Sequence, residues 1–322
     1  MLKKASVLLV SISLLSGCAT IKLGPSYDDP LKQQVVAKAK AADGKVLMIP
    51  IEGLIANEGS KGLLSQSPGL LDKVMMQLRE AERDDSIQAV LLKVNSPGGG
   101  VTTSDIFYHE LKAFKARSGK KVYVQMMDVG ASGAYYLALA ADHIQVHPTT
   151  LTGSVGVITL LPNVSGLNEK IGVEVKTYKT GENKDTGSPF RETTQADDVY
   201  LQTLVDEMAQ RFYALVQQQR GLSDSKMNEI KQAKVYLGEE AVMAGLVDSV
   251  GYLSDASEQA CALAGKTQCD LVTYRFEANA NANVYSPNMQ AGAQAPALNL
   301  IQSNLLSPLT ELRPGSYYLY LQ

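Results

Sequence analysis

Residues 121–141 run Lys121-Val-Tyr-Val-Gln-Met-Met-Asp-Val-Gly-Ala-Ser-Gly-Ala-Tyr-Tyr-Leu-Ala-Leu-Ala-Ala141. Their apolar run at 121–127 predicts a buried strand, and 134–141 predicts a short apolar helix. Ser132 lies in the turn between the two. The same order recurs along the chain, with strands expected at 45–51, 87–94, 144–146, 155–158 and 173–178, and helices at 70–83, 104–117, 197–220, 224–232 and 239–244. Strands that alternate with helices predict an α/β fold with a mostly parallel sheet.

The composition is that of a globular protein with enough apolar material for a core. The chain has 322 residues, of which 45% are hydrophobic and 20% charged. Its formal net charge is only −3, and its sequence pI is about 5.7. Such a balance lacks the basic character of a nucleic-acid-binding protein, so we expect no nucleic-acid partner.

The N-terminus predicts export. Lys3 and Lys4 precede a compact apolar stretch at 7–15, and Leu15-Ser-Gly-Cys18 follows. The apolar stretch is too short to span a membrane, so residues 1–17 are interpreted as a signal peptide. The ending resembles a bacterial lipobox, which implies lipidation of Cys18 and attachment to a membrane. The alternative is an ordinary signal with an incidental Cys18. Ala19 after the cysteine favours the outer membrane, with a periplasmic domain, if the source is Gram-negative.

The rest of the chain divides by composition. Residues 18–43 are expected to be a membrane tether that ends in a short helix, and 44–272 a single folded domain. The Asn/Ala- and Gln-biased stretch at 273–313 predicts a flexible linker. The apolar, Tyr-rich tail at 314–322 is expected to add a strand to a sheet edge, pack on a neighbour, or lie in a peptide groove.

Two further cysteines, Cys261 and Cys269, admit two interpretations. An exported chain meets an oxidising compartment, which favours a local disulfide. The alternative is a pair of small buried residues. Neither has a His or another Cys at metal-ligand spacing, so no metal site is predicted.

Ser132 also admits two interpretations. Serine is a favoured N-cap residue, and a short helix follows it. However, Gly130, Ala131, Gly133 and Ala134 leave space around the hydroxyl, and a helix N-terminus favours an oxyanion. The turn therefore predicts either a helix cap or a nucleophile.

Asn95-Ser-Pro-Gly-Gly-Gly100 follows the strand expected at 87–94. Three consecutive glycines are more permissive than a turn needs, and they let backbone N–H groups approach a ligand oxygen. This suits an oxyanion hole. A phosphate site is disfavoured, because neither of the two common Gly-rich phosphate-binding patterns is present.

A nucleophilic serine needs a base, and the candidates are few. The chain has three histidines, of which His109 belongs to an amphipathic helix, while His143 and His147 flank a strand. A Ser–His–Asp arrangement with either of the last two stays open, although nothing in their spacing favours it. Lys184 is the other candidate, and a lysine acts as a base only when its amine is neutral.

Together these segments resemble the signal peptide peptidase A family of Ser–Lys peptidases, in its short single-domain form. Five motifs carry the resemblance, in the family's order and over about residues 45–265: 95–100, 130–136, 151–157 (Leu-Thr-Gly-Ser-Val-Gly-Val), 184–189 (Lys-Asp-Thr-Gly-Ser-Pro), and 235–241 with 245–248. One departure is Ala134, where relatives often have a second Gly.

The resemblance implies a ClpP/crotonase-like α/β/α spiral fold that assembles into homo-oligomeric rings. It implies Ser132 as nucleophile, Lys184 as general base and Ser154 as the residue that orients the lysine. The N–H groups of Gly99 and Ser132 would form the oxyanion hole. In the family the serine and the lysine come from adjoining units. The expected substrates are released signal peptides and other extended apolar peptides, and no cofactor is expected.

Two other functions stay open at this stage. One is a noncatalytic peptide-binding lipoprotein on the same fold. The other is a crotonase-like acyl-thioester enzyme, which export disfavours because acyl-CoA is cytoplasmic. The presence of both Ser132 and Lys184 favours the peptidase.

Overall fold

A computed structural model describes residues 30–57, 60–61, 66–275 and 315–320. The signal peptide, Cys18 and the linker from residue 276 onward lie outside the described residues. Among the described residues, no helix has the length and apolar character needed to cross a membrane.

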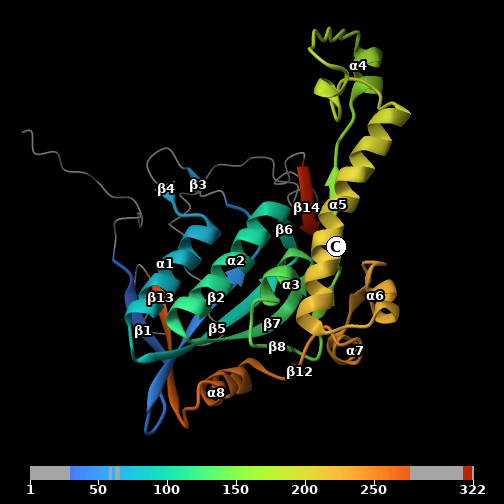
Figure 1. Ribbon diagram of the computed structural model, residues 1–322. Helices are drawn as coiled ribbons and strands as arrows, with labels where there is room; N and C mark the ends of the chain where they lie inside the picture. Colours follow the sequence, from blue (N-terminus) through green and yellow to red (C-terminus); the bar gives the residue numbers. More distant parts are fainter. Residues whose placement is uncertain (1–29, 58–59, 62–65, 276–314, 321–322) are drawn as a thin grey trace, which may run out of the picture.

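A nine-stranded sheet forms the centre of the molecule (Figure 1). Its main path has the order β1-β13-β2-β5-β7-β8-β12, and β9 and β11 extend it beyond β7. The strands are β1 (Lys32–Ala37), β13 (Cys269–Arg275), β2 (Gly44–Glu52), β5 (Ile87–Ser96), β7 (Lys121–Ala131), β8 (His143–Val146), β12 (Ser249–Val250), β9 (Leu151–Gly153) and β11 (Val235–Tyr236). All pairs are parallel except β1 with β13 and β11 with β9, which confirms the mostly parallel sheet.

Alternating side chains place a core on each face of this sheet. Along β2, Leu47, Ile49 and Ile51 join the core under α1 (Leu70–Arg83), α2 (Val101–Ser118) and α3 (Gly133–Ala138). Val46 and Met48 join a smaller core under α8 (Leu253–Leu263). Successive residues of a strand point to opposite faces, so near-continuous apolar runs are required where helices cover both.

A long arm leaves this body (Figure 1). The arm, defined here as residues 165–204, comprises α4 (Ser165–Ile171), the 3₁₀ turn η1 (Glu182–Asp185) and the first part of α5 (Gln195–Arg220). The rest of α5 packs on the body through the buried Phe212 and Val216. α6 (Asp224–Ile230) and α7 (Gly238–Met243) follow.

A second, three-stranded sheet has the order β10-β14-β6, with β10 at Ile158–Leu160, β14 at Gly315–Leu319 and β6 at Gly98–Gly100. β14 is the C-terminal tail, and it lies antiparallel between its two neighbours. Of the three placements expected for the tail, strand addition is the one observed. β3 (Ser60–Lys61) and β4 (Gln66–Ser67) form a separate pair.

Four segments differ from the sequence-based expectation. The strand expected at 155–158 is displaced, because β9 ends at Gly153 and β10 begins at Ile158. Residues 273–275 were expected to belong to the linker, but they form the end of β13. The tether was expected to reach residue 43, but residues 32–37 form the edge strand β1, paired with β13. The strand expected at 173–178 is absent, and this segment is irregular with Val173 and Val175 exposed. Alternating apolar residues form a strand only beside a partner strand, and 173–178 has none among the described residues.

Candidate active site

Ser132 lies between β7 and α3 in a backbone conformation that is rare for any residue except glycine. Its φ is 54°, its exposed fraction is 1%, and its hydroxyl has no hydrogen-bond partner among the described residues. It occupies the N-cap position of α3, but its side chain makes no capping hydrogen bond. The hydroxyl therefore does not act as a helix cap. Strain and an unpaired buried polar atom are typical of functional sites.

Ser154 follows the neighbouring strand β9 at the equivalent position. Ala131 of β7 pairs with Gly153 of β9, and Ser132 and Ser154 each come next. Ser154 also has a positive φ, 49°, and its N–H donates to the Lys234 carbonyl at 2.8 Å. The fold thus brings the predicted Ser132 and Ser154 to the same end of two adjacent parallel strands.

The Gly-rich loop presents one backbone edge to this end of the sheet. The Ile55 N–H donates to the Gly98 carbonyl at 2.8 Å, and the Gly100 N–H donates to the Ile55 carbonyl at 2.9 Å. Because successive residues of an extended chain direct their polar groups to opposite edges, the Gly99 N–H faces the other side. That side carries the tail, where Gly99 pairs with Tyr318.

A peptide carbonyl of the tail lies at the edge of the Gly-rich loop that faces away from Ile55. The Tyr320 N–H donates to the Pro97 carbonyl at 2.8 Å. In an antiparallel ladder the directly bonded pairs recur every second residue, so Tyr318 and Gly99 form the next such pair. The Gly99 N–H is therefore directed at the Tyr318 carbonyl.

Gly133, the first residue of α3, lies beside the same oxygen. The sequence analysis predicted only that Gly133 leaves space around the Ser132 hydroxyl and assigned the oxyanion hole to Gly99 and Ser132. A Cβ on Gly133 would lie 3.0 Å from the Tyr318 oxygen and 3.1 Å from the Gly99 nitrogen. The first N–H groups of a helix have no acceptor within the helix and favour negative charge. Its place at a helix start, directly after the candidate serine, is the sequence signal that could have found it.

The Ser132 N–H, by contrast, donates to the Gly153 carbonyl at 2.8 Å in this structure. This hydrogen bond joins the turn to β9 and leaves the Ser132 N–H already paired. The Gly99 N–H is thus the backbone donor directed at the tail carbonyl, and Gly133 lies beside the same oxygen.

Lys184 lies on the arm, exposed, in η1. Its neighbour Thr186 donates a hydrogen bond to Asp197, in the first turn of α5, at 2.7 Å. Phe212, which contacts the body, lies fifteen residues after Asp197 on α5. At 1.5 Å per residue, the two residues are about 22 Å apart along the helix. Ser132 and Lys184 of one chain are therefore not brought together.

A network of charged groups holds the turn that carries Lys184. Arg191 donates to Asp197 at 2.6 Å and to Asp185 at 2.9 Å, and Lys179 donates to Asp185 at 2.7 Å. The hydrogen bonds from Arg191 and Lys179 lower the pKa of Asp185 to about 2. The pKa of Asp197 is lowered as well, above all by Arg191. Both carboxylates therefore stay ionised at neutral pH.

The histidines lie elsewhere. His143 pairs with Tyr123 of β7. Tyr123 lies eight residues before Ala131, which is about 26 Å along the strand at about 3.3 Å per residue. Its Nε2 lies 2.8 Å from Ser249 Oγ, and burial lowers its pKa. The His147 ring lies 2.9 Å from Thr149 Oγ1, and the His147 N–H donates to the Met126 carbonyl at 3.1 Å. Neither histidine is placed as a base for Ser132.

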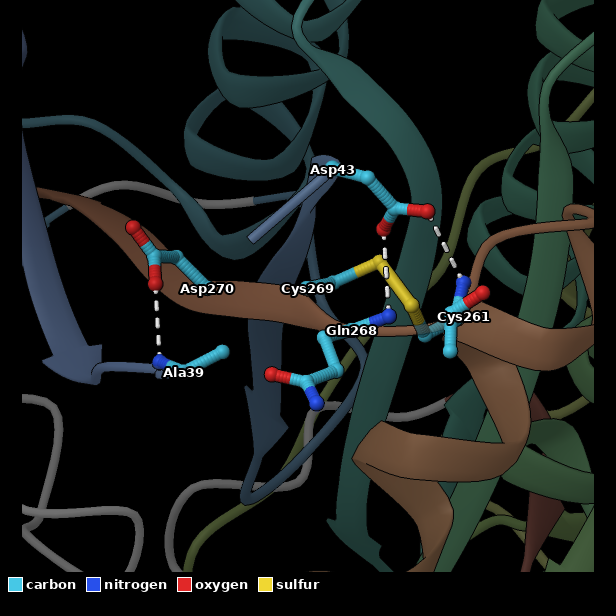
Figure 2. The surroundings of a disulfide bond; sticks show 7 residues. Ala39, Asp43, Cys261, Gln268, Cys269 and Asp270 are labelled. Carbon is cyan, nitrogen blue, oxygen red and sulfur yellow. Dashed lines mark hydrogen bonds between the residues drawn. A yellow bond between two sulfur atoms is a disulfide. The ribbon is translucent and has the colours of Figure 1, made fainter. Parts of the chain in front are cut away.

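Cys261 of α8 and Cys269 of β13 form a disulfide (Figure 2). Asp43, between β1 and β2, accepts hydrogen bonds from the N–H groups of Thr267 and Gln268 at 3.0 and 3.1 Å. Asp43 and the two cysteines are also near enough to ligate a metal ion. With both sulfurs in the disulfide, the thiolates that such a site needs are not present.

The chain is similar to known peptidases. The model of peptidase family S49 matches residues 114–267, and the Clp protease model matches residues 67–150. A protein of Enterococcus faecium named as signal peptide peptidase SppA is 32% identical over 248 residues, which cover 77% of this chain and 72% of that protein. A protein of Methanocaldococcus jannaschii named as a protease is 39% identical over 202 residues, covering 63% and 64%.

Protease 4 of Haemophilus influenzae is 34% identical over 226 residues, and the match spans 70% of this chain but 35% of that protein. Among solved structures, a mutant of the 1510-N membrane-bound stomatin-specific protease has 16% identity and a TM-score of 0.43, over 67% of this chain and 84% of that one. The Clp protease match and the helix-covered parallel sheet together show the ClpP/crotonase-like fold.

Proposed function

The chain belongs to the signal peptide peptidase A family, peptidase family S49, and from this membership we propose that Ser132 and Lys184 form its catalytic dyad. The observation that carries the proposal is the tail. An extended peptide lies antiparallel to the Gly-rich loop, with one carbonyl directed at Gly99 and lying beside Gly133, the residue that follows Ser132. The Ser132 hydroxyl is buried and has no hydrogen-bond partner among the described residues. A substrate peptide would bind in the same way, by strand addition.

The proposed reaction is an acyl transfer through the serine. The neutral Lys184 amine removes the Ser132 proton as Oγ attacks the peptide carbonyl carbon, and the oxygen becomes an anion held by the N–H groups of Gly99 and Gly133. The lysine ammonium then returns the proton to the departing amine. Water, deprotonated by the same lysine, hydrolyses the acyl-enzyme and regenerates Ser132. Ser154, by family resemblance, orients the amine.

The base is proposed to come from an adjoining copy. Within one chain Lys184 lies at the far end of α5 from Phe212, so a second chain has to supply it. The arm has the apolar surface that such an assembly would bury. Its exposed apolar side chains are Leu167, Ile171, Val173, Val175, Tyr178, Phe190, Val199, Tyr200 and Leu204. Exposed apolar groups of this extent mark interaction sites, and a ring is the closed assembly that a head-to-tail contact generates.

The proposed substrates are signal peptides released at the membrane and other extended apolar peptides. Lipidation at Cys18 would hold the exported domain on the membrane surface, where such peptides are produced. The alternative is a noncatalytic lipoprotein that binds peptides beside the Gly-rich loop and assembles in the same way, but does not hydrolyse them.

The experiment measures hydrolysis of a fluorogenic peptide by wild type, Ser132→Ala and Lys184→Ala. Each variant alone should be inactive, whereas Lys176→Ala, an exposed arm lysine paired only with Glu174 in the described structure, should keep activity. The two inactive variants are then unfolded together and reassembled. If the dyad crosses between copies, about a quarter of the sites receive both an intact serine and an intact lysine.

Activity in the reassembled mixture would support the shared dyad. A mixture as inactive as its components would place the dyad within one chain. Full activity of Ser132→Ala would reject the peptidase mechanism, and an inactive wild type would favour the noncatalytic alternative.

A further inference from the structure

Two cations are buried on the face of the central sheet that α8 covers. Arg275 is the last residue of β13 and is 5% exposed, and Lys93 of β5 is 6% exposed. Leu91 belongs to the core under α8, so Lys93, two residues later, faces the same side. Arg275 has the same relation to Leu271, which lies four residues before it in β13. A charge taken out of water is costly unless it is paired and hydrogen-bonded, so both cations need a partner.

The two cations lie on either side of Pro50 in β2. Lys93 pairs with Pro50 in the ladder between β5 and β2. On the other side of β2, the ladder with β13 ends at the pair Leu47 and Val272. Proline has no N–H to donate to a ladder, and three residues beyond this pair Arg275 lies level with Pro50. Neighbouring strands are about 4.8 Å apart, so the backbones of Lys93 and Arg275 are about 10 Å apart, and their long side chains can reach one group between them.

The described residues supply one nearby carboxylate, Glu52, for this positive charge. Lys93 Nζ lies 3.7 Å from Glu52 Oε1, which is too long for a good hydrogen bond, and the Glu52 side chain is 35% exposed. Nε and Nη1 of Arg275 are buried and have no hydrogen-bond partner among the described residues. Burial lowers the pKa of Arg275, and the charge of Glu52 opposes this effect. Lys32, paired with Arg275 across β1 and β13, adds a third cation on the same face, so positive charge is in excess.

We propose that Arg275 and Lys93 form a binding site for a phosphate group. Guanidinium and ammonium groups bind phosphate oxygens through charge-assisted hydrogen bonds. A phosphate monoester carries a charge of about −1.5 to −2 at pH 7 and three acceptor oxygens. It would therefore offset the excess positive charge and supply acceptors for the unpaired N–H groups of Arg275, which a single carboxylate does less well. This inference goes beyond the proposed peptidase function and does not depend on it.

Free phosphate and the phosphate of a lipid headgroup share this chemistry. The site lies near the β1 edge of the sheet, and β1 begins at Lys32 (Figure 1). Lys32 follows Cys18, the proposed point of lipid attachment, by fourteen residues. A chain of this length spans at most about 50 Å, so this edge of the sheet would stay within that distance of the membrane surface.

The test is calorimetric titration of the full-length chain in detergent with two probes. One probe is inorganic phosphate, and the other is glycerophosphoglycerol, the soluble headgroup of phosphatidylglycerol. Arg275→Gln and Lys93→Gln should each weaken binding at least about tenfold, because a charge-assisted hydrogen bond is lost. Arg83→Gln is the matched control, since Arg83 is exposed and paired with Glu80, and it should bind as wild type does. Tighter binding of the headgroup would assign the site to a lipid, and tighter binding of inorganic phosphate would assign it to a free phosphate or phosphate monoester.

Urea unfolding gives a second measurement, for which Arg275→Leu is the variant. In phosphate-free buffer this variant should unfold at the same urea concentration as wild type or a higher one, because an unpaired buried charge is removed. Phosphate should raise the urea midpoint of wild type but not that of Arg275→Leu, and sodium chloride at the same ionic strength should not replace it.

The proposal would be overturned if wild type bound neither probe, or if Arg275→Gln and wild type bound them equally. A wild-type midpoint that phosphate raises no more than sodium chloride does would overturn it as well. Peptide hydrolysis is not measured in either experiment, so loss of the peptidase proposal would leave these results unaffected.

Discussion

Ser132 and Ser154 leave adjacent parallel strands, and both have a positive φ, 54° and 49°. Each follows one residue after the paired Ala131 and Gly153. Holding two such residues side by side costs energy that the surrounding sheet has to supply. Ser154→Gly removes the hydroxyl and relieves the backbone strain, so the fold should be at least as stable. If Ser154 positions the lysine, kcat should fall by about 10- to 100-fold, with a shifted pH profile. Retained kcat, or a loss without any change in the profile, would contradict the positioning role.

Gly133→Ala should lower activity without unfolding the chain. The added methyl group would overlap Ser104 Oγ and lie 3.0 Å from the position of the carbonyl oxygen. Alanine keeps the N–H of residue 133, but its methyl group should displace the carbonyl oxygen from the oxyanion site. Loss of one hydrogen bond to an oxyanion typically lowers kcat about 10²- to 10³-fold, and we expect an effect of up to this order in steady-state kinetics. Gly166→Ala in α4 is the matched control, since its Cβ would meet no atom within 4 Å. Unchanged kcat in Gly133→Ala would remove Gly133 from the oxyanion hole.

Tyr318→Ala should raise the rate at which the enzyme hydrolyses an external peptide. The tail occupies the same edge of β6 that a substrate needs, and the Tyr318 ring is its buried anchor. Removing a buried aromatic ring typically destabilises its contact by about 3 kcal/mol or more. The tail should therefore leave the edge of β6 more often. The measurement is KM for a fluorogenic peptide, with Tyr320→Ala as the control for a less buried tail position. A higher KM in Tyr318→Ala would show that the tail assists substrate binding.

The acid limb of the pH–rate profile should come from the lysine base. If Lys184 is the base, as proposed, activity should fall as pH decreases, because a general base has to accept the Ser132 proton. Asp185 and Asp197, which hold the turn that carries Lys184, do not explain a loss of activity above pH 4. The pKa of Asp185 is lowered from 3.8 to about 2, so its stabilising contribution is complete above pH 4 and is lost only as pH falls toward 2.

Arg191→Gln tests this assignment, because it removes the main hydrogen-bond donor to Asp185 and Asp197. Activity should drop at every pH while the midpoint of the acid limb stays in place. A midpoint that moves with Arg191→Gln would assign the limb to the carboxylates.

The disulfide should stabilise the fold without contributing to the reaction. Cys261 and Cys269 are eight positions apart, and closing so short a loop contributes about 2.5 kcal/mol in the chain-entropy model. The Cys261→Ser, Cys269→Ser double variant should unfold at a lower urea concentration and keep its kcat. The same urea midpoint for the reduced and oxidised wild type would show that the bridge adds no stability.

Local sequence patterns predicted the elements whose own residues indicate that they are buried. The apolar run at 121–127 and the small residues around Ser132 predicted β7, the turn and α3, because burial and helix start signals depend on neighbouring residues. The same reasoning failed at 173–178 and at β1. A strand exists only beside another strand, and the partner cannot be inferred from the segment itself.

In the candidate site, too, some features could be predicted from local sequence and others depend on the fold. Residue types at fixed spacing were enough to predict the Gly-rich loop, the serine turn and the family to which they belong. Three relationships could be seen only in the folded chain: Tyr318 pairs with Gly99, Gly133 lies beside the same oxygen, and Lys184 lies far from Ser132 of its own chain. These relationships join opposite ends of the chain, and they depend on sheet register and on the length of α5. Both are properties of the packed fold, set by which apolar faces are buried together.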